Sequence, residues 1–305
     1  MMEHVERYVA LKCALGCKYK NEARLLRAWA DTAMACGHRF ICADTMIRWA
    51  RQTPSDQWAR RRLGVGRRFA LWLRAEDHRH EVPHPESLGR PREQRRTPFL
   101  LSDAQIRRLM EAALRLPPAD SITPHTIHCI IGLIAVTGLR RAEACALRVP
   151  DLTADGLVVR LTKFAKSRLV PLSQDTIDAL HRYLRVRKQL GGAGERLFVL
   201  STGKAINPDI LTGMFIKLAR ATGLRGGKGE PGVTLHDLRH RFAVRSLEQA
   251  IAVDRGSVSR HILALSTYLG HVNVSSTGWY LHATPVLLRQ IAENAEAVHS
   301  GRAAS

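Results

Sequence analysis

The sequence predicts a mainly α-helical protein with a small antiparallel β-sheet, divided into two domains. Apolar residues recur at helical spacing along most of the 305 residues. Two short apolar runs, at 156–162 and 168–172, are typical of the paired strands of a hairpin. A polar stretch with several prolines, which ends at Pro98, is typical of an extended linker. We therefore expect a helical domain over 1–88, a linker over 89–98 and a second domain over 99–305.

The first domain is predicted to hold four helices, at 5–15, 25–33, 41–50 and 55–73, with Ser55 as the N-cap of the last. An apolar stripe would anchor this last helix. Its arginines would then remain free to bind a phosphate backbone. These are Arg60, Arg61, Arg62, Arg67 and Arg68. A solvated arginine face without a ligand is the alternative.

The second domain is predicted to begin with a helix from Ser102 to Leu114, because Ser102-Asp-Ala-Gln is a helix-start pattern. A helix is also expected directly after Arg140. The apolar run at 197–200 is predicted to add a third strand to the hairpin. The remaining helices are expected at 126–136, 173–188, 208–221, 235–249 and 257–268.

The chain is strongly basic, with 47 Lys+Arg against 27 Asp+Glu and a net charge of +20. A folded protein of this charge favours a polyanionic partner, nucleic acid ahead of a membrane surface, although a generally basic proteome gives the same composition. No apolar run is long enough to span a membrane, and the first residues lack the apolar core of a signal peptide. Six cysteines are too few for a secreted disulfide scaffold. We therefore expect a cytoplasmic protein.

Four segments that are far apart in the sequence hold polar groups suited to a single reaction. In the first, Thr137-Gly-Leu-Arg140, a glycine breaks one helix and Arg140 starts the next, so its guanidinium is placed to face an anion. The second is the hairpin tip. The third and fourth are a His-x-x-Arg pair on one helix face and a Leu-Gly-His segment followed by a tyrosine. Their side chains are Lys163 with Lys166, His236 with Arg239, and His271 with Tyr280.

These motifs resemble the tyrosine recombinase (phage integrase) family. The family signature is an Arg in Thr-Gly-Leu-Arg-x-x-Glu, a hairpin Lys, His-x-x-Arg, Leu-Gly-His, and a Tyr nine residues later. The matching residues are Arg140 with Glu143, then Lys163, His236, Arg239, His271 and Tyr280. The resemblance covers residues 99–298 well, whereas residues 1–88 match only the family's general helical DNA-clamping domain.

The resemblance implies a catalytic domain over 99–305 and a core-DNA-binding domain over 1–88. It implies a site-specific recombinase or integrase of a bacterial mobile element. Its partner would be double-stranded DNA with inverted-repeat core sites, bound by a homo-tetramer that is a monomer or dimer when free. No metal and no other cofactor is expected.

The proposed chemistry follows from the residue types. Cutting a phosphodiester without a metal requires cations that neutralise the charge developing on the non-bridging oxygens. Arg140 and Arg239, assisted by His271, would do this. The phenol of Tyr280 would be the nucleophile, and His236 would accept its proton. Lys163 would protonate the leaving 5′ hydroxyl, and the 3′-phosphotyrosine product would store the bond energy, so that rejoining needs no ATP.

Several residues keep a second interpretation. Lys166 is the rival of Lys163 as the general acid and is otherwise a DNA contact. Arg241 is either a further phosphate contact or a surface residue. His240 is an accessory candidate that we place on a different helix face from His236.

Two acidic residues and a group of cysteines complete the candidates. Glu143 and Asp237 are expected to orient the arginines and histidines rather than to react. A zinc site in the first domain is an alternative that the residue spacings do not favour. Its ligands would be Cys13, Cys17, Cys36, His38 and Cys42.

Two rival functions remain open on the sequence. A type IB topoisomerase resembles this residue set in its Arg, Lys, Arg, His and Tyr chemistry. A DNA-binding regulator would keep the fold without cutting, but it has no need of a phenol nine residues after an imidazole. Metal-dependent nucleases would require clustered carboxylates, and none stands out.

The C-terminal segment carries an apolar stripe at helical spacing, which predicts a tail helix. The family resemblance implies that this tail docks on a neighbouring subunit in the recombining tetramer. Packing against its own domain is the alternative. The stripe consists of Val286, Leu287, Leu288, Ile291, Ala295 and Val298.

Overall fold

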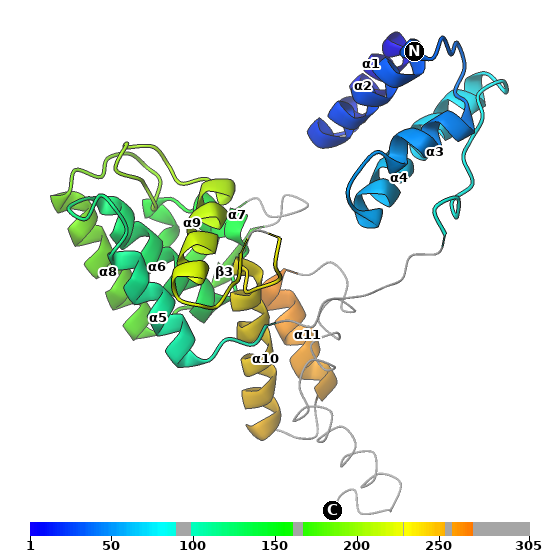
Figure 1. Cartoon of the computed structure of the whole chain (residues 1–305). Coiled ribbons are helices and arrows are strands. Elements are labelled where there is room, and N and C mark those ends of the chain that lie inside the picture. Colours follow the sequence, from blue (N-terminus) through cyan, green and yellow to red (C-terminus); the bar gives the residue numbers. More distant parts are fainter. Residues whose placement is uncertain (90–98, 161–166, 228, 254–257, 271–305) are drawn as a thin grey trace, which may run out of the picture. The chain divides into compact units, whose positions relative to one another are not determined.

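The computed structural model describes residues 1–89, 99–160, 167–227, 229–253 and 258–270. They belong to two compact units, Met1–Arg95 and Arg96–Ser305, called unit 1 and unit 2 below. Figure 1 shows each unit as a bundle of helices. The expectations for Lys163, Lys166, His271, Tyr280 and the tail helix fall outside the described residues.

Unit 1 contains the four predicted helices, which are confirmed. They are α1 (Met2–Ala14), α2 (Lys20–Ala35), α3 (Ala43–Arg51) and α4 (Asp56–Glu76). Ser55 is the N-cap of α4, because its side chain accepts a hydrogen bond from the backbone N–H of Trp58 at 3.2 Å. The apolar faces of the helices meet in a core that contains the fully buried Trp29, Trp49 and Phe69.

Unit 2 is built around one largely buried helix, Ile122–Thr137, against which several of the other helices pack. Ser102 and Gln105 form the predicted capping box at the start of the first helix. The helices are α5 (Asp103–Leu114), α6 (Ile122–Thr137), α7 (Arg141–Ala146), α8 (Gln174–Gln189), α9 (Pro208–Ala221), α10 (Leu235–Val253) and α11 (Val258–Leu269). A short 3₁₀ turn, η1 (Val149–Asp151), leads into the sheet. None of the described helices is long and apolar enough to cross a lipid bilayer.

The small sheet has three antiparallel strands in the order β1 (Leu152–Thr153), β2 (Gly156–Val159) and β3 (Arg168–Val170). The hairpin of β2 and β3 is the predicted one, with Leu157 opposite Val170 and Val159 opposite Arg168. This register places Arg168 on the same face of the sheet as the buried Val159.

The prediction of a third strand at 197–200 is wrong. The third strand is β1, which precedes the hairpin. Leu197, Phe198 and Val199 are all buried in the core of unit 2. In this region the chain forms only isolated bridges, between Arg148 and Arg196 and between Val199 and Ala205. A short apolar run indicates burial, and here the burial is that of a turning segment rather than of a strand.

The last two described helices pack side by side and form a small core of their own (Figure 1). Ala243, Val244 and Leu247 of α10 meet Leu265 and Leu269 of α11 there. The main core of unit 2 lies among the other helices and the sheet, and the first turn of α10 contributes Leu235 and Leu238 to it. The end of α11 packs against this small core, and Tyr268 also packs against the main core.

Candidate active site

The turn between α6 and α7 places Arg140. Gly138 ends α6 in the left-handed conformation, with a φ of 62°, and Arg140 is the N-cap of α7 in an extended conformation. A Cβ atom on Gly138 would lie 2.5 Å from Cδ1 of Phe242, so a side chain does not fit there. The predicted helix break and the helix start after Arg140 are thus both present.

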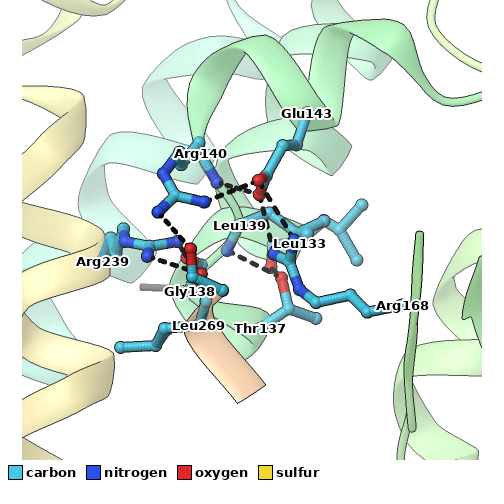
Figure 2. A network of polar contacts seen from close by, with 10 residues as sticks. Leu133, Thr137, Gly138, Leu139, Arg140, Glu143, Arg168, Arg239 and Leu269 are labelled. Carbon is cyan, nitrogen blue, oxygen red and sulfur yellow. Dashed lines mark hydrogen bonds and ion pairs between the residues drawn. The ribbon is translucent and has the colours of Figure 1, made fainter. Parts of the chain in front are cut away.

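Arg140 is held by a carboxylate on one side and by a backbone carbonyl on the other (Figure 2). Its Nη1 donates to Oε1 of Glu143 at 2.8 Å, and its backbone N–H donates to Oε2 of the same residue at 3.0 Å. Its Nη2 donates to the carbonyl oxygen of Gly270 at 2.9 Å. The side chain retains 33% exposure, so the guanidinium remains open on one side.

Arg239 is the second cation of the site and is almost fully buried, with 1% exposure. Its Nη1 donates to the carbonyl of Gly138 at 2.6 Å, and its Nη2 donates to the carbonyl of Leu269 at 2.9 Å (Figure 2). Arg140 and Arg239 therefore bind consecutive carbonyls at the C-terminal end of α11. Helix C-termini carry partial negative charge and unpaired carbonyls, which suits cations.

Glu143 is shared by two arginines, as Figure 2 shows. Besides Arg140 it binds Arg168, whose Nη1 and Nη2 lie 3.1 Å and 2.8 Å from Oε1 and Oε2. Burial by itself would raise the pKa of Glu143, but hydrogen bonds from Arg168 and from the backbone of Arg140 outweigh it and lower this pKa to about 2. The carboxylate is therefore ionised at neutral pH. The expectation that Glu143 orients an arginine agrees with these contacts.

Sequence reasoning did not single out Arg168. Its partner Glu143 is distant in the sequence, so no local motif contains both. One signal was present: Arg168 starts a strand on the face that Val159 buries, and a charged residue at an inward-facing position needs a partner.

His236 and His240 lie on the same face of α10, so the prediction of different faces is wrong. Their ring centroids are 4.2 Å apart in an edge-to-face arrangement. The physical reason is simple, because residues four apart in a helix stand one above the other. Partial burial and the charge of Arg239 lower the pKa of His236 below its ordinary value, although Asp237 opposes this. His236 is therefore neutral at neutral pH.

Asp237 and Arg241 bind other parts of unit 2. Asp237 accepts hydrogen bonds from the backbone N–H and hydroxyl of Thr234, both at 2.7 Å, and from the N–H of Phe99 at 3.1 Å. It thus caps α10 and ties Phe99 to the start of this helix. Arg241 donates to the carbonyl of Leu101 at 2.8 Å and pairs with Asp103 at the start of α5.

The five arginines of α4 fall into two groups. Three bind backbone carbonyls of unit 1: Arg60 binds Gly89, Arg62 binds Trp49 and Gln52, and Arg67 binds Pro83. Arg61 and Arg68 are exposed. Arg61 lies over the ring of Trp58 and 3.7 Å from Glu22.

The structure does not assemble the alternative zinc site. All its proposed ligands are described, yet no group of three or more His, Cys, Asp or Glu residues in the described part of the chain could hold a metal ion. The cysteines in question are free thiols.

Comparisons with known proteins identify the family of the chain and agree with its fold. The model of the phage integrase family matches residues 100–286. The integrase/recombinase y4rB of Sinorhizobium fredii is 36% identical over 298 residues, which cover 94% of each chain. The tyrosine recombinase XerD of Brucella suis is 29% identical over 262 residues, covering 84% of this chain and 80% of XerD.

Solved structures show the same fold. The integrase of transposon Tn1549, in complex with transposon right-end DNA, has a TM-score of 0.68 at 18% identity and covers 96% of this chain and 98% of its own. A lambda integrase dimer bound to a core site has a TM-score of 0.67 at 17% identity, with coverages of 93% and 96%. Together, the family match and the curated relatives define a site-specific DNA recombinase of the integrase class. The chain belongs to the phage integrase family, the tyrosine-type site-specific DNA recombinases.

Proposed function

We propose that the protein cuts and rejoins DNA at specific sites through a covalent 3′-phosphotyrosine intermediate, without metal or ATP. The observation that carries the proposal is the meeting of Arg140 and Arg239 at the end of α11. In the sequence His271 follows this end directly, and Tyr280 stands nine residues later. Two guanidinium groups, with the imidazole and the phenol of these residues, would supply the positive charge and the nucleophile of the reaction, and Lys163 would supply the proton for the leaving hydroxyl.

The reaction begins when the phenol oxygen of Tyr280 attacks the scissile phosphorus and its proton passes to His236. The lowered pKa of His236 keeps the imidazole neutral and able to accept this proton. Arg140, Arg239 and His271 neutralise the charge that develops on the non-bridging oxygens. The bond from phosphorus to the 5′ oxygen breaks, and Lys163 gives a proton to the leaving hydroxyl. A 5′ hydroxyl of another strand reverses these steps.

We propose double-stranded DNA with inverted-repeat core sites as the partner, and the positive charge of the chain supports a nucleic-acid backbone. The net charge of +20 suits a phosphate backbone, and the exposed Arg61 and Arg68 of α4 offer contacts in unit 1. A lambda integrase tetramer bound to a Holliday junction has the same fold, with a TM-score of 0.67 at 17% identity. We therefore propose that this protein is a monomer or dimer when free and a tetramer on DNA. As an enzyme of a bacterial mobile element it would act in the cytoplasm.

The decisive experiment is covalent capture on a nicked suicide substrate, made from inverted repeats in the DNA that flanks the gene. The wild-type protein should become attached to the DNA, whereas Tyr280→Phe should bind it and remain unattached, because only one oxygen is lost. Tyr268→Phe is the matched control. Tyr268 packs against Phe242, and burial raises the pKa of its phenol to about 12. Removing this hydroxyl should therefore leave covalent capture unchanged.

Two outcomes would contradict the proposal. Capture that persists in Tyr280→Phe would show that another group is the nucleophile. Relaxation of a supercoiled plasmid that lacks the repeats, at the same rate as one that carries them, would favour a type IB topoisomerase.

A further inference from the structure

We propose that Arg168 is a positioning residue for the cleavage reaction, because it holds Glu143 and so leaves the charge of Arg140 available to the scissile phosphate. This inference rests on the proposed function. It concerns a side chain of β3 that does not belong to the recombinase signature described above.

The first argument is geometric. Arg168 grips Glu143 with both terminal nitrogens, at 3.1 Å and 2.8 Å, in the planar fork arrangement that fixes a carboxylate most firmly (Figure 2). The same two oxygens accept the side-chain and backbone N–H groups of Arg140. Because each oxygen is bound from both sides, Glu143 cannot turn without breaking a bond to one of the arginines.

The second argument concerns charge. If Glu143 were paired with Arg140 alone, the pair would be neutral, and the carboxylate would compete with a phosphate for the guanidinium. With Arg168 included, the three side chains carry a net charge of +1. Arg239 raises the charge of the site to +2, before His236 or any residue outside the described part of the chain is counted.

The third argument is burial. Glu143 is 8% exposed and Arg168 is 15% exposed, so water screens their interaction poorly. Ion pairs on the surface contribute little, whereas removing one partner of a buried pair leaves the other with an uncompensated charge. The arrangement of Glu143 and Arg140 therefore depends on Arg168.

The fourth argument is that the turn after α11 lies close to both Arg168 and Arg140. A Cβ atom on Gly270 would lie 3.2 Å from Nη1 of Arg168 and 3.6 Å from Nη1 of Arg140. Gly270 has a φ of 64°, which glycine adopts without strain. Both guanidinium groups thus border the backbone that leads to His271, and Arg168 joins this turn to the hairpin strand that follows Lys163.

The test compares Arg168→Met with Arg168→Lys, Glu143→Gln and the control Arg160→Met. Arg160 directly follows β2 in the same hairpin and also binds a buried carboxylate, that of Asp151 at 2.6 Å, but it has no recorded contact with Arg140. At saturating enzyme, Arg168→Met should slow covalent capture about tenfold or more, with DNA affinity changed less than about threefold. Arg168→Lys should restore part of the rate, and Arg160→Met should cleave like the wild type.

A double-mutant cycle separates positioning from general damage to the fold. In a Glu143→Gln background there is no carboxylate charge to share, so adding Arg168→Met should cost far less than it does alone. Equal losses in the two backgrounds, or wild-type cleavage by Arg168→Met, would overturn the inference.

A readout without DNA keeps this inference distinct from the proposed function. Titration of ¹³C-labelled Glu143 by NMR should show its pKa rising towards the ordinary value in Arg168→Met and staying low in Arg160→Met. If the wild-type protein captures no DNA, the proposed function fails, and the titration alone decides whether Arg168 controls Glu143. An unchanged titration in Arg168→Met would refute that control.

Discussion

At the scale of single residues, Gly138 combines three tasks at one position. It adopts a φ of 62°, its missing side chain makes room for Phe242 and Leu269, and its carbonyl accepts Arg239. Gly138→Ala should therefore destabilise unit 2 by about 1–3 kcal/mol in urea unfolding and slow cleavage as well. Gly203→Ala is the control, because its φ of 73° is similar but no atom lies within 4 Å of the added Cβ. Equal losses of stability in both variants would show that crowding at Gly138 is unimportant.

His80 predicts a pH dependence of unit 1. It is 3% exposed, and its Nδ1 accepts the backbone N–H of Ile41 at 3.1 Å. Burial lowers the pKa of His80, and the nearby charges of Asp77, His4, Arg79 and Glu76 act in opposing directions. The unfolded chain, with a pKa of about 6.5, thus binds the proton more readily. The contribution to stability is complete above about pH 6.5 and is lost as the pH falls through the lower folded pKa.

Unit 1 should accordingly melt at a lower temperature at pH 5 than at pH 7.5. His80→Asn keeps an acceptor for Ile41 but does not titrate, so it should reduce this difference, whereas the exposed His78→Asn should not. Tryptophan fluorescence is the measurement, because four of the five tryptophans lie in unit 1. A melting temperature that changes equally with pH in the wild type and His80→Asn would assign the effect to other groups.

At the scale of the secondary-structure elements, the arginines of α4 have two roles. Arg60, Arg62 and Arg67 bind backbone carbonyls of unit 1, whereas Arg61 and Arg68 are exposed and can contact a ligand. Arg61→Ala with Arg68→Ala should reduce the slope of log affinity against log salt by about 1.8, since each lost phosphate contact contributes about 0.9. Arg67→Ala is the control and should leave the slope unchanged, because Arg67 binds the carbonyl of Pro83. A slope that changes only with Arg67→Ala would reverse this assignment.

The elements also show what local sequence patterns can and cannot predict. The bounds of α9 were predictable to the residue, because Asn207 caps the N–H groups of Asp209 and Ile210 and Pro208 fits the first turn. By contrast, α6 begins at Ile122 rather than near Thr126, since Pro124 lies in the first turn of the helix, where its missing N–H costs nothing.

The candidate site was predictable where a motif is local and not where it depends on tertiary contacts. Arg140 and Arg239 stand in short motifs, and the structure brings both to one helix end. The pairing of Arg168 with Glu143 arises only when the hairpin packs beside α7. The expected strand at 197–200 failed for the same reason, because burial alone does not determine hydrogen-bond partners.

At the scale of the whole molecule, assembly is predicted to depend on the C-terminal segment. Removing residues 286–305 should leave a protein that binds a half-site but fails to synapse two sites, because the apolar stripe beginning at Val286 would no longer reach a neighbouring subunit. Gel-shift and strand-exchange assays measure the two steps separately. Full-rate recombination by the truncated protein would show that the tail is not an assembly element, and misfolding would show that it packs on its own domain.

Arg140 and Arg239 donate hydrogen bonds to carbonyls at the end of α11. The stability of this helix and the phosphate affinity of the site are therefore thermodynamically linked. Its apolar contacts form a small core, so local opening of α11 costs less than unfolding unit 2. Such opening takes the carbonyls of Leu269 and Gly270 away from Arg239 and Arg140. By thermodynamic reciprocity, any phosphate that binds better to the closed arrangement must also slow hydrogen exchange in α11. Binding of such a phosphate should therefore slow hydrogen exchange of the amides of α11, which measures substrate binding through the stability of a helix.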